Sequence, residues 1–153
     1  AESLGINDSI VLPNSIRLTE HTLKYGWDSI NGGIFDKGLY ISPDRVHIID
    51  NHKSWWAELE ALNTFLLMSI KVPAEQERYY NYFVEQWNYI DQNLIDHTNG
   101  EFYNYGIDTD PDNKFNMKGH AWKASYHTTR SLVNCIRMLD DIKKADTVNE
   151  KYF

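Results

Sequence analysis

The sequence predicts an all-α fold of about four helices, arranged as two helical hairpins with long loops that carry short β-hairpins. Apolar residues recur at helical spacing in successive segments, which polar loops separate. The turn segment 28–35 (Asp-Ser-Ile-Asn-Gly-Gly-Ile-Phe) is echoed by segment 96–103 (Asp-His-Thr-Asn-Gly-Glu-Phe-Tyr). Each copy follows an amphipathic helix and precedes a loop and a Trp-led helix. The chain therefore contains two copies of one structural unit.

The beginning of the chain is predicted as one helix followed by a looped hairpin. An irregular opening stretch is expected to end at Pro13, and Asn14 or Ser15 can cap a helix that runs to about Trp27. Residues 34–50 then alternate between apolar and polar types and are interrupted by Gly and Ser-Pro-Asp turns. This pattern favours a long loop that contains a short β-hairpin.

Two further helices are predicted on either side of Pro73. Residues 54–71 place leucines and an isoleucine on one stripe, so this helix should bury a single face. Pro73 ends it and suits the first turn of a third helix over about residues 74–96. The residues of the third helix that are expected to point inward are Tyr80, Phe83, Trp87, Ile90 and Leu94.

A fourth helix is predicted from about Gly119 to Lys144, and its opening turns carry an unusual set of side chains. One helical stripe would hold Trp122, Tyr126, Thr129 and Val133. His127 and Arg130 would lie beside that stripe. A surface helix has little use for so many aromatic rings, and a core helix would avoid His and Arg. We therefore expect these turns to form the floor of a pocket.

Composition favours a sugar ligand over nucleic acid. Aromatic residues make up 14% of the chain and hydrophobic residues 42%, enough for a core and for stacking surfaces. The net charge of −7 argues against nucleic acid, because binding to phosphates requires clustered Lys and Arg. No apolar run approaches the ~20 residues of a membrane span, so no membrane partner is expected.

Cys135 is the single cysteine of the chain, so no intrachain disulfide can form, and we expect this thiol in the core. A reducing, cytoplasmic location is the corresponding hypothesis. The chain opens with Ala1-Glu2-Ser3, with neither an initiator Met nor a signal-like apolar segment. We interpret it as a piece of a longer polypeptide.

The two repeat units are predicted at about residues 14–72 and 73–145, within a single fragment that spans residues 1–153. Two helical hairpins make only an open wedge, because a hairpin repeat cannot bury both of its faces alone. A wedge this rich in aromatic residues should expose more than the ~300–600 Å² apolar patch of an ordinary monomer. We therefore expect partner helices, from the same parent chain or from another subunit, to cover it.

Two segments resemble the sequence signatures of the N-acylglucosamine 2-epimerase family. Residues 53–62 (Lys-Ser-Trp-Trp-Ala-Glu-Leu-Glu-Ala-Leu) are similar to the family motif K-x-W-W-x-Q-A-E-A-L, with Glu58-Leu59 standing where the motif has Gln-Ala. Residues 118–130 resemble the second signature, K-G-x-x-W-K-x-x-Y-H-x-x-R, and the Asp-x-x-Asn-Gly turns match as well. The similarity covers nearly the whole chain after about Asn14.

The resemblance implies a partial (α/α)6 barrel. The complete ring of this family has six helical hairpins with the active site in its inner funnel, and this chain resembles the C-terminal end. Family members are 2-epimerases of N-acylglucosamine, cellobiose and mannose-type sugars, and aldose–ketose isomerases. One His removes a proton beside the carbonyl of an open-chain sugar, an enediolate forms, and a second His returns a proton. A mono- or disaccharide is the implied substrate, with no cofactor and no metal.

Residue roles follow from the same match. His127 stands at the position of the family's C-terminal catalytic His. Trp55 and Trp122 match aromatic residues that shape the sugar site, and Glu60 matches a carboxylate that lines it. Arg130 is assigned to substrate binding, with a structural ion pair as the alternative.

Trp55 and Trp56 cannot both face one direction, because adjacent helical residues point about 100° apart. We expect Trp55 in the pocket and Trp56 in the core, since the repeat partner of Trp55 is Trp122. The family's other catalytic His lies in an earlier repeat, in a G-H-x-x-E-type helix, and this chain has no such motif. The fragment by itself should therefore be inactive.

Other functions stay open on sequence grounds. A glycoside hydrolase or lyase would also suit an (α/α)6 barrel, but it would require two opposed carboxylates. A non-catalytic carbohydrate-binding piece would suit the aromatic content. Residues 108–112 (Asp-Thr-Asp-Pro-Asp) imitate the start of a calcium loop, but Asn113 and Gly119 replace the Gly and Glu that such a loop requires, so no metal is predicted.

Overall fold

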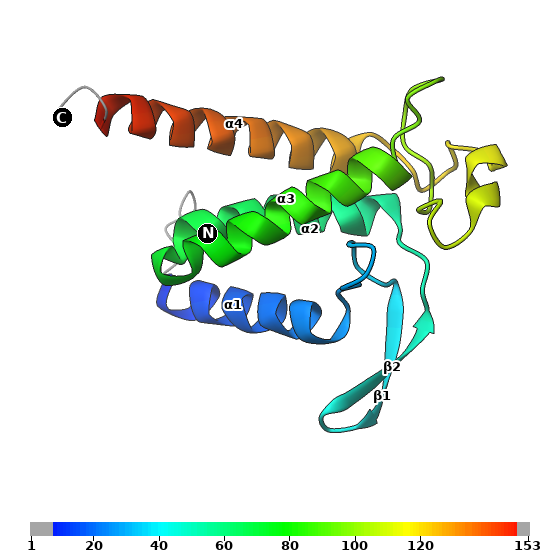
Figure 1. Cartoon of the computed structure of the whole chain (residues 1–153), viewed down its shortest axis with the longest axis horizontal. Helices are drawn as coiled ribbons and strands as arrows, with labels where there is room; N and C mark the ends of the chain where they lie inside the picture. Colours follow the sequence, from blue (N-terminus) through cyan, green and yellow to red (C-terminus); the bar gives the residue numbers. More distant parts are fainter. Residues whose placement is uncertain (1–7, 150–153) are drawn as a thin grey trace.

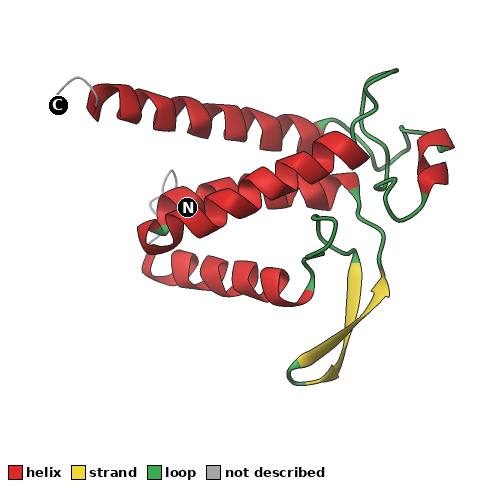
Figure 2. Cartoon of the chain, viewed as in Figure 1, coloured by secondary structure: helices red, strands yellow, loops and turns green. Residues whose placement is uncertain are grey.

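The computed structural model describes residues 8–149 and, within them, the side chains of residues 9–145. Its helices are α1 (Asp8–Tyr25), α2 (Trp55–Lys71), α3 (Gln76–Asn93) and α4 (Tyr126–Asn149). The strands β1 (Lys37–Ser42) and β2 (Arg45–Asp50) connect α1 to α2, and short 3-10 helices occupy Pro73–Glu75 and Pro111–Phe115. The long helices run roughly alongside one another, and the hairpin projects at one end (Figure 1). Helix dominates the described part of the chain (Figure 2), as the sequence predicts.

The helix α2 is the centre of the fold, because it packs against both α3 and α4 and more lightly against α1. Its apolar stripe is fully enclosed: Leu59, Leu62, Phe65 and Leu66 are at most 1% exposed. From the other helices the core receives Phe83, Tyr89, Ile90 and Cys135. The expected core position of Cys135 is confirmed, and burial raises the pKa of its thiol to about 11.

The first helix begins earlier than predicted. It starts at Asp8 and includes Pro13, which the sequence reading took as the end of an irregular stretch. Asn14 and Ser15 do not cap it. Their side chains donate instead to backbone carbonyls four residues back, at 2.9 and 3.0 Å. Pro13 has no N–H to donate within the helix, and the helix continues through it.

The predicted hairpin is confirmed within segment 34–50. The strands β1 and β2 are antiparallel, with Lys37 opposite Asp50 and Ser42 opposite Arg45. Pro43 and Asp44 form the connection. Much of the hairpin surface is exposed, including Leu39, Tyr40, Ile41 and Ile49.

The third predicted helix buries three of its five expected inward residues. Phe83, Ile90 and Leu94 are buried as expected, but Tyr80 and Trp87 are 40% and 39% exposed. Tyr79, Gln86 and Tyr89 are buried in addition. Two of these side chains make polar bonds. The Tyr79 hydroxyl donates to Glu20 at 2.5 Å, and the Gln86 amide donates to the side chain and backbone of Glu58.

The fourth helix begins later than predicted, at Tyr126 and not near Gly119. Residues 119–125 are neither helix nor strand, with a turn at residues 121–122 and a bend at Ser125. In this segment the backbone N–H of Lys123 donates to the carbonyl of His120, and the Lys123 side chain donates to the carbonyl of Phe102. The first contact is local, and the second joins the segment to a residue far away in sequence.

The two Asp-x-x-Asn-Gly turns have the same structure. Oδ1 of Asp28 accepts the N–H groups two and three residues ahead at 2.9 and 3.2 Å, and Oδ1 of Asp96 does the same at 2.9 and 3.0 Å. The fifth residue of each turn, Gly32 or Gly100, has φ of 78° or 75°. This left-handed conformation favours glycine, so the turn sequence and the turn geometry repeat together.

Large apolar side chains remain exposed along the outer surfaces of the helices. They include Leu18 on α1, Leu67 and Ile70 on α2, Tyr80 and Trp87 on α3, and Val133 and Ile136 on α4. An open wedge of helical hairpins is expected to expose apolar faces of this kind. Among the described helices, none combines the length and the apolar character that crossing a bilayer requires.

Candidate active site

The first turns of α2 present one face to the core and a neighbouring face to the candidate site. Trp55 and Leu59 lie four residues apart on the buried face and are 7% and 0% exposed. Trp56 and Glu60 are also four residues apart and share the neighbouring face. That face is open, since Trp56 is 43% exposed. The helix thus presents one indole and one carboxylate side by side.

Glu60 and His127 form the centre of the site. His127 is the second residue of α4, and its Nδ1 lies 2.8 Å from Oε1 of Glu60. Arg130, less than one turn further along α4, forms an ion pair with the same carboxylate oxygen. The side chains of His127 and Glu60 are 35% and 25% exposed, so the pair is reachable from solvent.

Aromatic rings flank the imidazole on two sides. The ring centroid of Trp56 lies 5.7 Å from that of His127, and the ring of Tyr126 lies 5.1 Å away in an edge-on arrangement. The guanidinium of Arg130 stands 5.2 Å from the centre of the Tyr126 ring, over its face. Amphipathic walls of this kind bind ligands that have both apolar and hydroxyl-bearing faces.

The contact with Glu60 defines the tautomer of His127. A carboxylate has no hydrogen to donate, so Nδ1 carries the hydrogen of this bond. In the neutral ring Nε2 then holds the lone pair and can accept a proton. The carboxylate also stabilises the imidazolium that forms when it does. The pair is therefore suited to acid–base chemistry.

A groove of about 320 Å³ opens beside this pair, between α1 and α2. Trp56, Glu60 and Thr64 line it from α2, and Leu18 and Thr22 line it from α1. A wider depression of about 600 Å³ lies along residues 73–78, at the far end of α2 from Glu60. We place the candidate site at the smaller groove, because Glu60 and Trp56, the α2 residues beside His127, line it.

The predicted orientation of the two adjacent tryptophans is wrong. Trp55 belongs to the core cluster, where it packs with Leu59, and it contacts the His120 ring at 5.5 Å and the Lys123 ammonium at 5.2 Å. Trp56 is the ring that faces His127. The physical reason is helical spacing: Trp55 continues the leucine stripe of α2, whereas Trp56 lies one turn before Glu60.

Trp122 lies apart from the helix that was predicted to carry it. Its side chain is 88% exposed in the segment before α4, so it shares no helical stripe with Tyr126. Its backbone N–H donates to Nδ1 of His120 at 3.2 Å. Arg130 is engaged with Glu60, which is the ion pair foreseen as the alternative to substrate binding.

Sequence reasoning missed Trp56 as a wall of the site, whereas it placed Tyr126 on the expected pocket floor. The signal for Trp56 was its spacing of four residues from Glu60, which places both on one helical face. Matching Trp55 with Trp122 across the repeat obscured that signal.

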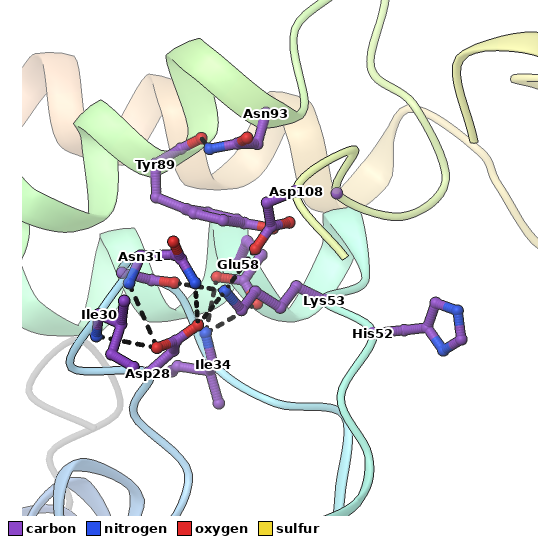
Figure 3. A network of polar contacts seen from close by, with 12 residues as sticks. Asp28, Ile30, Asn31, Ile34, His52, Lys53, Glu58, Tyr89, Asn93 and Asp108 are labelled. Carbon is purple, nitrogen blue, oxygen red and sulfur yellow. Dashed lines mark hydrogen bonds and ion pairs between the residues drawn. The ribbon is translucent and has the colours of Figure 1, made fainter. Parts of the chain in front are cut away.

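A buried polar network lies behind the site face of α2 (Figure 3). Both carboxylate oxygens of Glu58 accept the N–H of Ile34 at 3.1 Å, and one also accepts the Gln86 amide at 2.7 Å. Glu58 is fully buried, and this burial raises the pKa of its carboxyl to about 8 despite those bonds and the nearby Lys53. Glu58 stands where the family motif has Gln, and burial favours the neutral form of its carboxyl group.

Within the described part of the chain, no three His, Cys, Asp or Glu side chains gather closely enough to hold a metal ion. Two carboxylates of segment 108–112 accept hydrogen bonds from other residues of the protein. Asp108 accepts Lys53 and the Tyr89 hydroxyl at 2.8 Å each, and Asp110 accepts the backbone N–H of Asp112 at 3.0 Å.

Comparison with known proteins places this geometry in context. Residues 4–131 match the sequence profile of the N-acylglucosamine 2-epimerase (GlcNAc 2-epimerase) family. A D-mannose isomerase from Marinomonas mediterranea is 27% identical over 128 residues, which cover 84% of this chain and 31% of that protein. The chain therefore spans about a third of the length of this curated relative.

Solved structures give the same relationship. A D-mannose isomerase structure superposes with a TM-score of 0.59 and 26% identity, over 73% of this chain and 27% of the other. The cellobiose 2-epimerase of Spirochaeta thermophila gives a TM-score of 0.51 and 27% identity, over 65% and 24% of the two chains. These likenesses identify the hairpins as part of an (α/α)6 barrel. By the profile match over most of its length, the chain belongs to the N-acylglucosamine 2-epimerase family.

Proposed function

We propose that this chain is the C-terminal portion of a sugar 2-epimerase or aldose–ketose isomerase in which His127 transfers a proton. The observation that carries the proposal is the 2.8 Å contact between Nδ1 of His127 and Glu60. It leaves Nε2 as the proton-accepting nitrogen in a partly open site with aromatic walls. Membership of the N-acylglucosamine 2-epimerase family supports the same chemistry.

The reaction begins with an open-chain sugar whose C2 carries a hydrogen beside the C1 carbonyl. Nε2 of His127 takes the C2 proton, and the electrons of that bond move through C1 onto the carbonyl oxygen, giving an enediolate. An epimerase then returns a proton to the opposite face of C2. An isomerase returns it to C1 and moves a hydroxyl proton between the two oxygens. Both outcomes need proton transfers only, and positioned groups of this kind contribute about 10²–10⁴-fold.

The substrate class is a mono- or disaccharide. The similar proteins are named for D-mannose and for cellobiose, and those names span both sizes. In our proposal Trp56 and Tyr126 supply the ring faces against which a sugar packs. Arg130 acts through Glu60, with which it forms an ion pair. Trp122 remains a proposed substrate-binding residue, whereas Trp55 lies in the core and Trp56 takes its part at the site.

The proposal also assigns the remainder of the barrel to the parent polypeptide or to another subunit. Those helices would cover the exposed apolar faces and supply the second catalytic His. The repeat units at about residues 14–72 and 73–145 would then form two of the six hairpins. The chain alone should lack activity, because it has neither the second catalytic His nor the remaining walls of the site.

The test is isotope exchange. The complete polypeptide is incubated with D-mannose and with cellobiose in D₂O, and deuterium at C2 or C1 is followed by NMR. We expect uptake with the wild type and a loss of about 10²-fold or more in His127→Asn. His97→Asn is the matched control, because His97 is exposed and bonds the backbone carbonyl of Asp91.

Three results would contradict the proposal. Full exchange in His127→Asn would show that this imidazole is not catalytic. Sugar binding without any exchange in the wild type would favour a non-catalytic binding piece, and release of reducing ends from a glycan would favour a hydrolase or lyase. The hydrolase alternative gains no support from the site, where Glu60 is committed to His127 and Arg130.

A further inference from the structure

Each of the two Asp-x-x-Asn-Gly turns is bound by one lysine in the same way. Nζ of Lys53 donates to Oδ2 of Asp28 at 2.8 Å and to the carbonyl of Gly32 at 2.7 Å. Nζ of Lys118 donates to Oδ2 of Asp96 and to the carbonyl of Gly100, the latter at 2.8 Å. The ammonium group thus spans the first and fifth residues of its turn in both repeats. We call these two arrangements the lysine clamps.

Both lysines lie on the segments that lead into the helices of the candidate site. Lys53 stands two residues before α2 and three before Trp56, while Lys118 stands in the segment that leads to α4 and His127. The turn to which Lys53 donates follows α1, and the turn to which Lys118 donates follows α3. Each clamp therefore joins the end of one helix to the approach of the next, at the end of the fold where the candidate site lies.

The first clamp also joins the two repeats. Nζ of Lys53 makes a third bond, at 2.8 Å, to Asp108, whose other oxygen accepts the Tyr89 hydroxyl (Figure 3). The backbone adds to this connection, because the N–H of Gly106 donates to the carbonyl of Lys53 at 2.9 Å. The lysine side chain is fully buried, so these bonds are formed away from water. Charge-assisted bonds in such surroundings resist displacement.

We propose that Lys53 and Lys118 are positioning residues, which set the Glu60–His127 distance by fixing the entry of α2 and of α4. This inference rests on the proposed function for its catalytic readout. Neither lysine touches the imidazole, so each acts through its helix. A displacement of about 1 Å at a reacting group can cost about 10²-fold in rate, so small shifts in helix entry are sufficient to be measured.

The two clamps differ in how far they tolerate substitution. Lys53 is enclosed: a Cβ added at Gly33 would lie 2.9 Å from its Cδ, which leaves no room for a larger side chain. Removing its ammonium would also leave the carboxylates of Asp28 and Asp108 buried without their cation. Lys118 is 22% exposed, so its side chain reaches solvent. Lys118 is therefore the residue to test, because its variants retain the buried network around Lys53.

The experiment compares Lys118→Met, Lys118→Arg and the control Lys144→Met in the complete polypeptide. Lys144 is 75% exposed and pairs only weakly with Asp141, at 3.4 Å. Deuterium exchange gives kcat and KM, and thermal unfolding gives Tm, with kinetics measured well below the lowest Tm. We expect kcat of Lys118→Met to fall about 10- to 100-fold with KM within about twofold. Lys118→Arg should recover most of this loss, because a guanidinium can also bond a carboxylate and a carbonyl.

The possible outcomes separate this inference from the proposed function. A lower Tm with unchanged kcat in Lys118→Met would show a purely structural lysine and would overturn the positioning role, as would equal losses in Lys118→Met and Lys144→Met. If His127→Asn retains exchange, the proposed function fails, whatever Lys118→Met does. If His127→Asn loses exchange while Lys118→Met retains it, the positioning role alone fails.

Discussion

Oε1 of Glu60 lies 2.8 Å from Nδ1 of His127, although 67 residues separate the two in sequence. They meet because α2 and α4 pack directly against each other, and each residue lies in the opening turns of its helix. Arg130 reaches the same carboxylate oxygen from α4. The candidate site is thus an interhelical contact, so its geometry depends on how two neighbouring helices pack.

Replacing Glu60 by Gln should lower kcat while leaving the fold intact. The amide can still accept the Nδ1 hydrogen of His127, but it no longer carries the charge that stabilises an imidazolium. A hydrogen bond to a charged group contributes about 1.5–3 kcal/mol, which corresponds to a loss of about 10- to 150-fold in kcat. Isotope-exchange kinetics measure the loss. Glu85→Gln, at an exposed position on α3, is the control, and an equal loss there would contradict the prediction.

The adjacent tryptophans should respond to truncation in different ways. Trp55→Ala removes a ring from the core, so it should lower the free energy of unfolding by about 3–5 kcal/mol. Trp56→Ala removes a half-exposed ring beside His127, so it should cost about 1 kcal/mol or less in stability while impairing exchange. Urea denaturation and exchange kinetics, run on both variants, decide between the two orientations. Similar stability losses in both would contradict the assignment of faces.

Glu58 should make stability depend on pH. Burial raises the pKa of its carboxyl from 4.5 to about 8, so the folded state binds this proton more tightly than the unfolded state. The resulting stability is fully present below about pH 4.5 and is lost as pH rises to about 8. In that window the free energy of unfolding should fall by up to about 1.4 kcal/mol per pH unit. Urea denaturation between pH 5 and 8 measures this slope.

The variant Glu58→Gln should flatten that slope, because an amide does not titrate in this range. Glu85→Gln, with its exposed side chain, should keep the wild-type slope. Asp28 shows the opposite behaviour to Glu58, because its pKa is lowered and not raised. Burial opposes its ionisation, but bonds from Lys53, Ile30 and Asn31 outweigh that effect and lower its pKa to about 2. Its contribution is therefore lost only as pH falls from about 3.8 to about 2. An unchanged slope in Glu58→Gln would refute the assignment.

Gly106 should not tolerate a side chain. A Cβ at this position would overlap the Tyr89 hydroxyl and lie 2.5 Å from the Asp108 carboxylate. Gly106→Ala should therefore lower the free energy of unfolding by about 1–3 kcal/mol through overpacking. At Gly119 an added Cβ meets no atom within 4 Å, so Gly119→Ala should stay within about 0.5 kcal/mol of the wild type. Thermal or urea denaturation distinguishes the two, and equal effects would contradict the predicted crowding around Tyr89.

Local sequence patterns determined much of the fold. The leucine stripe of α2, the break at Pro73 and the hairpin within segment 34–50 were all predicted, because helical periodicity and turn residues act over a few positions. The repeated Asp-x-x-Asn-Gly turn was predicted as well, since its side-chain bonds are made within the turn itself. Glu60 and His127 were named from motifs, but their contact was not, because it joins distant segments.

Tertiary structure decided which aromatic residues of α3, and which of the two adjacent tryptophans of α2, are buried. Both stripes of α3 contain aromatic residues, so periodicity alone could not choose between Tyr80 and Tyr79; bonding of Tyr79 to Glu20 made the choice. Likewise, Trp56 rather than Trp55 faces His127, because the core accepts the residue that continues the leucine stripe. The start of α4 at Tyr126 also depends on contacts with residues far away in sequence, such as that of Lys123 with Phe102. The sequence therefore determined the elements and their turns, whereas long-range packing and buried polar bonds determined how the side chains converge.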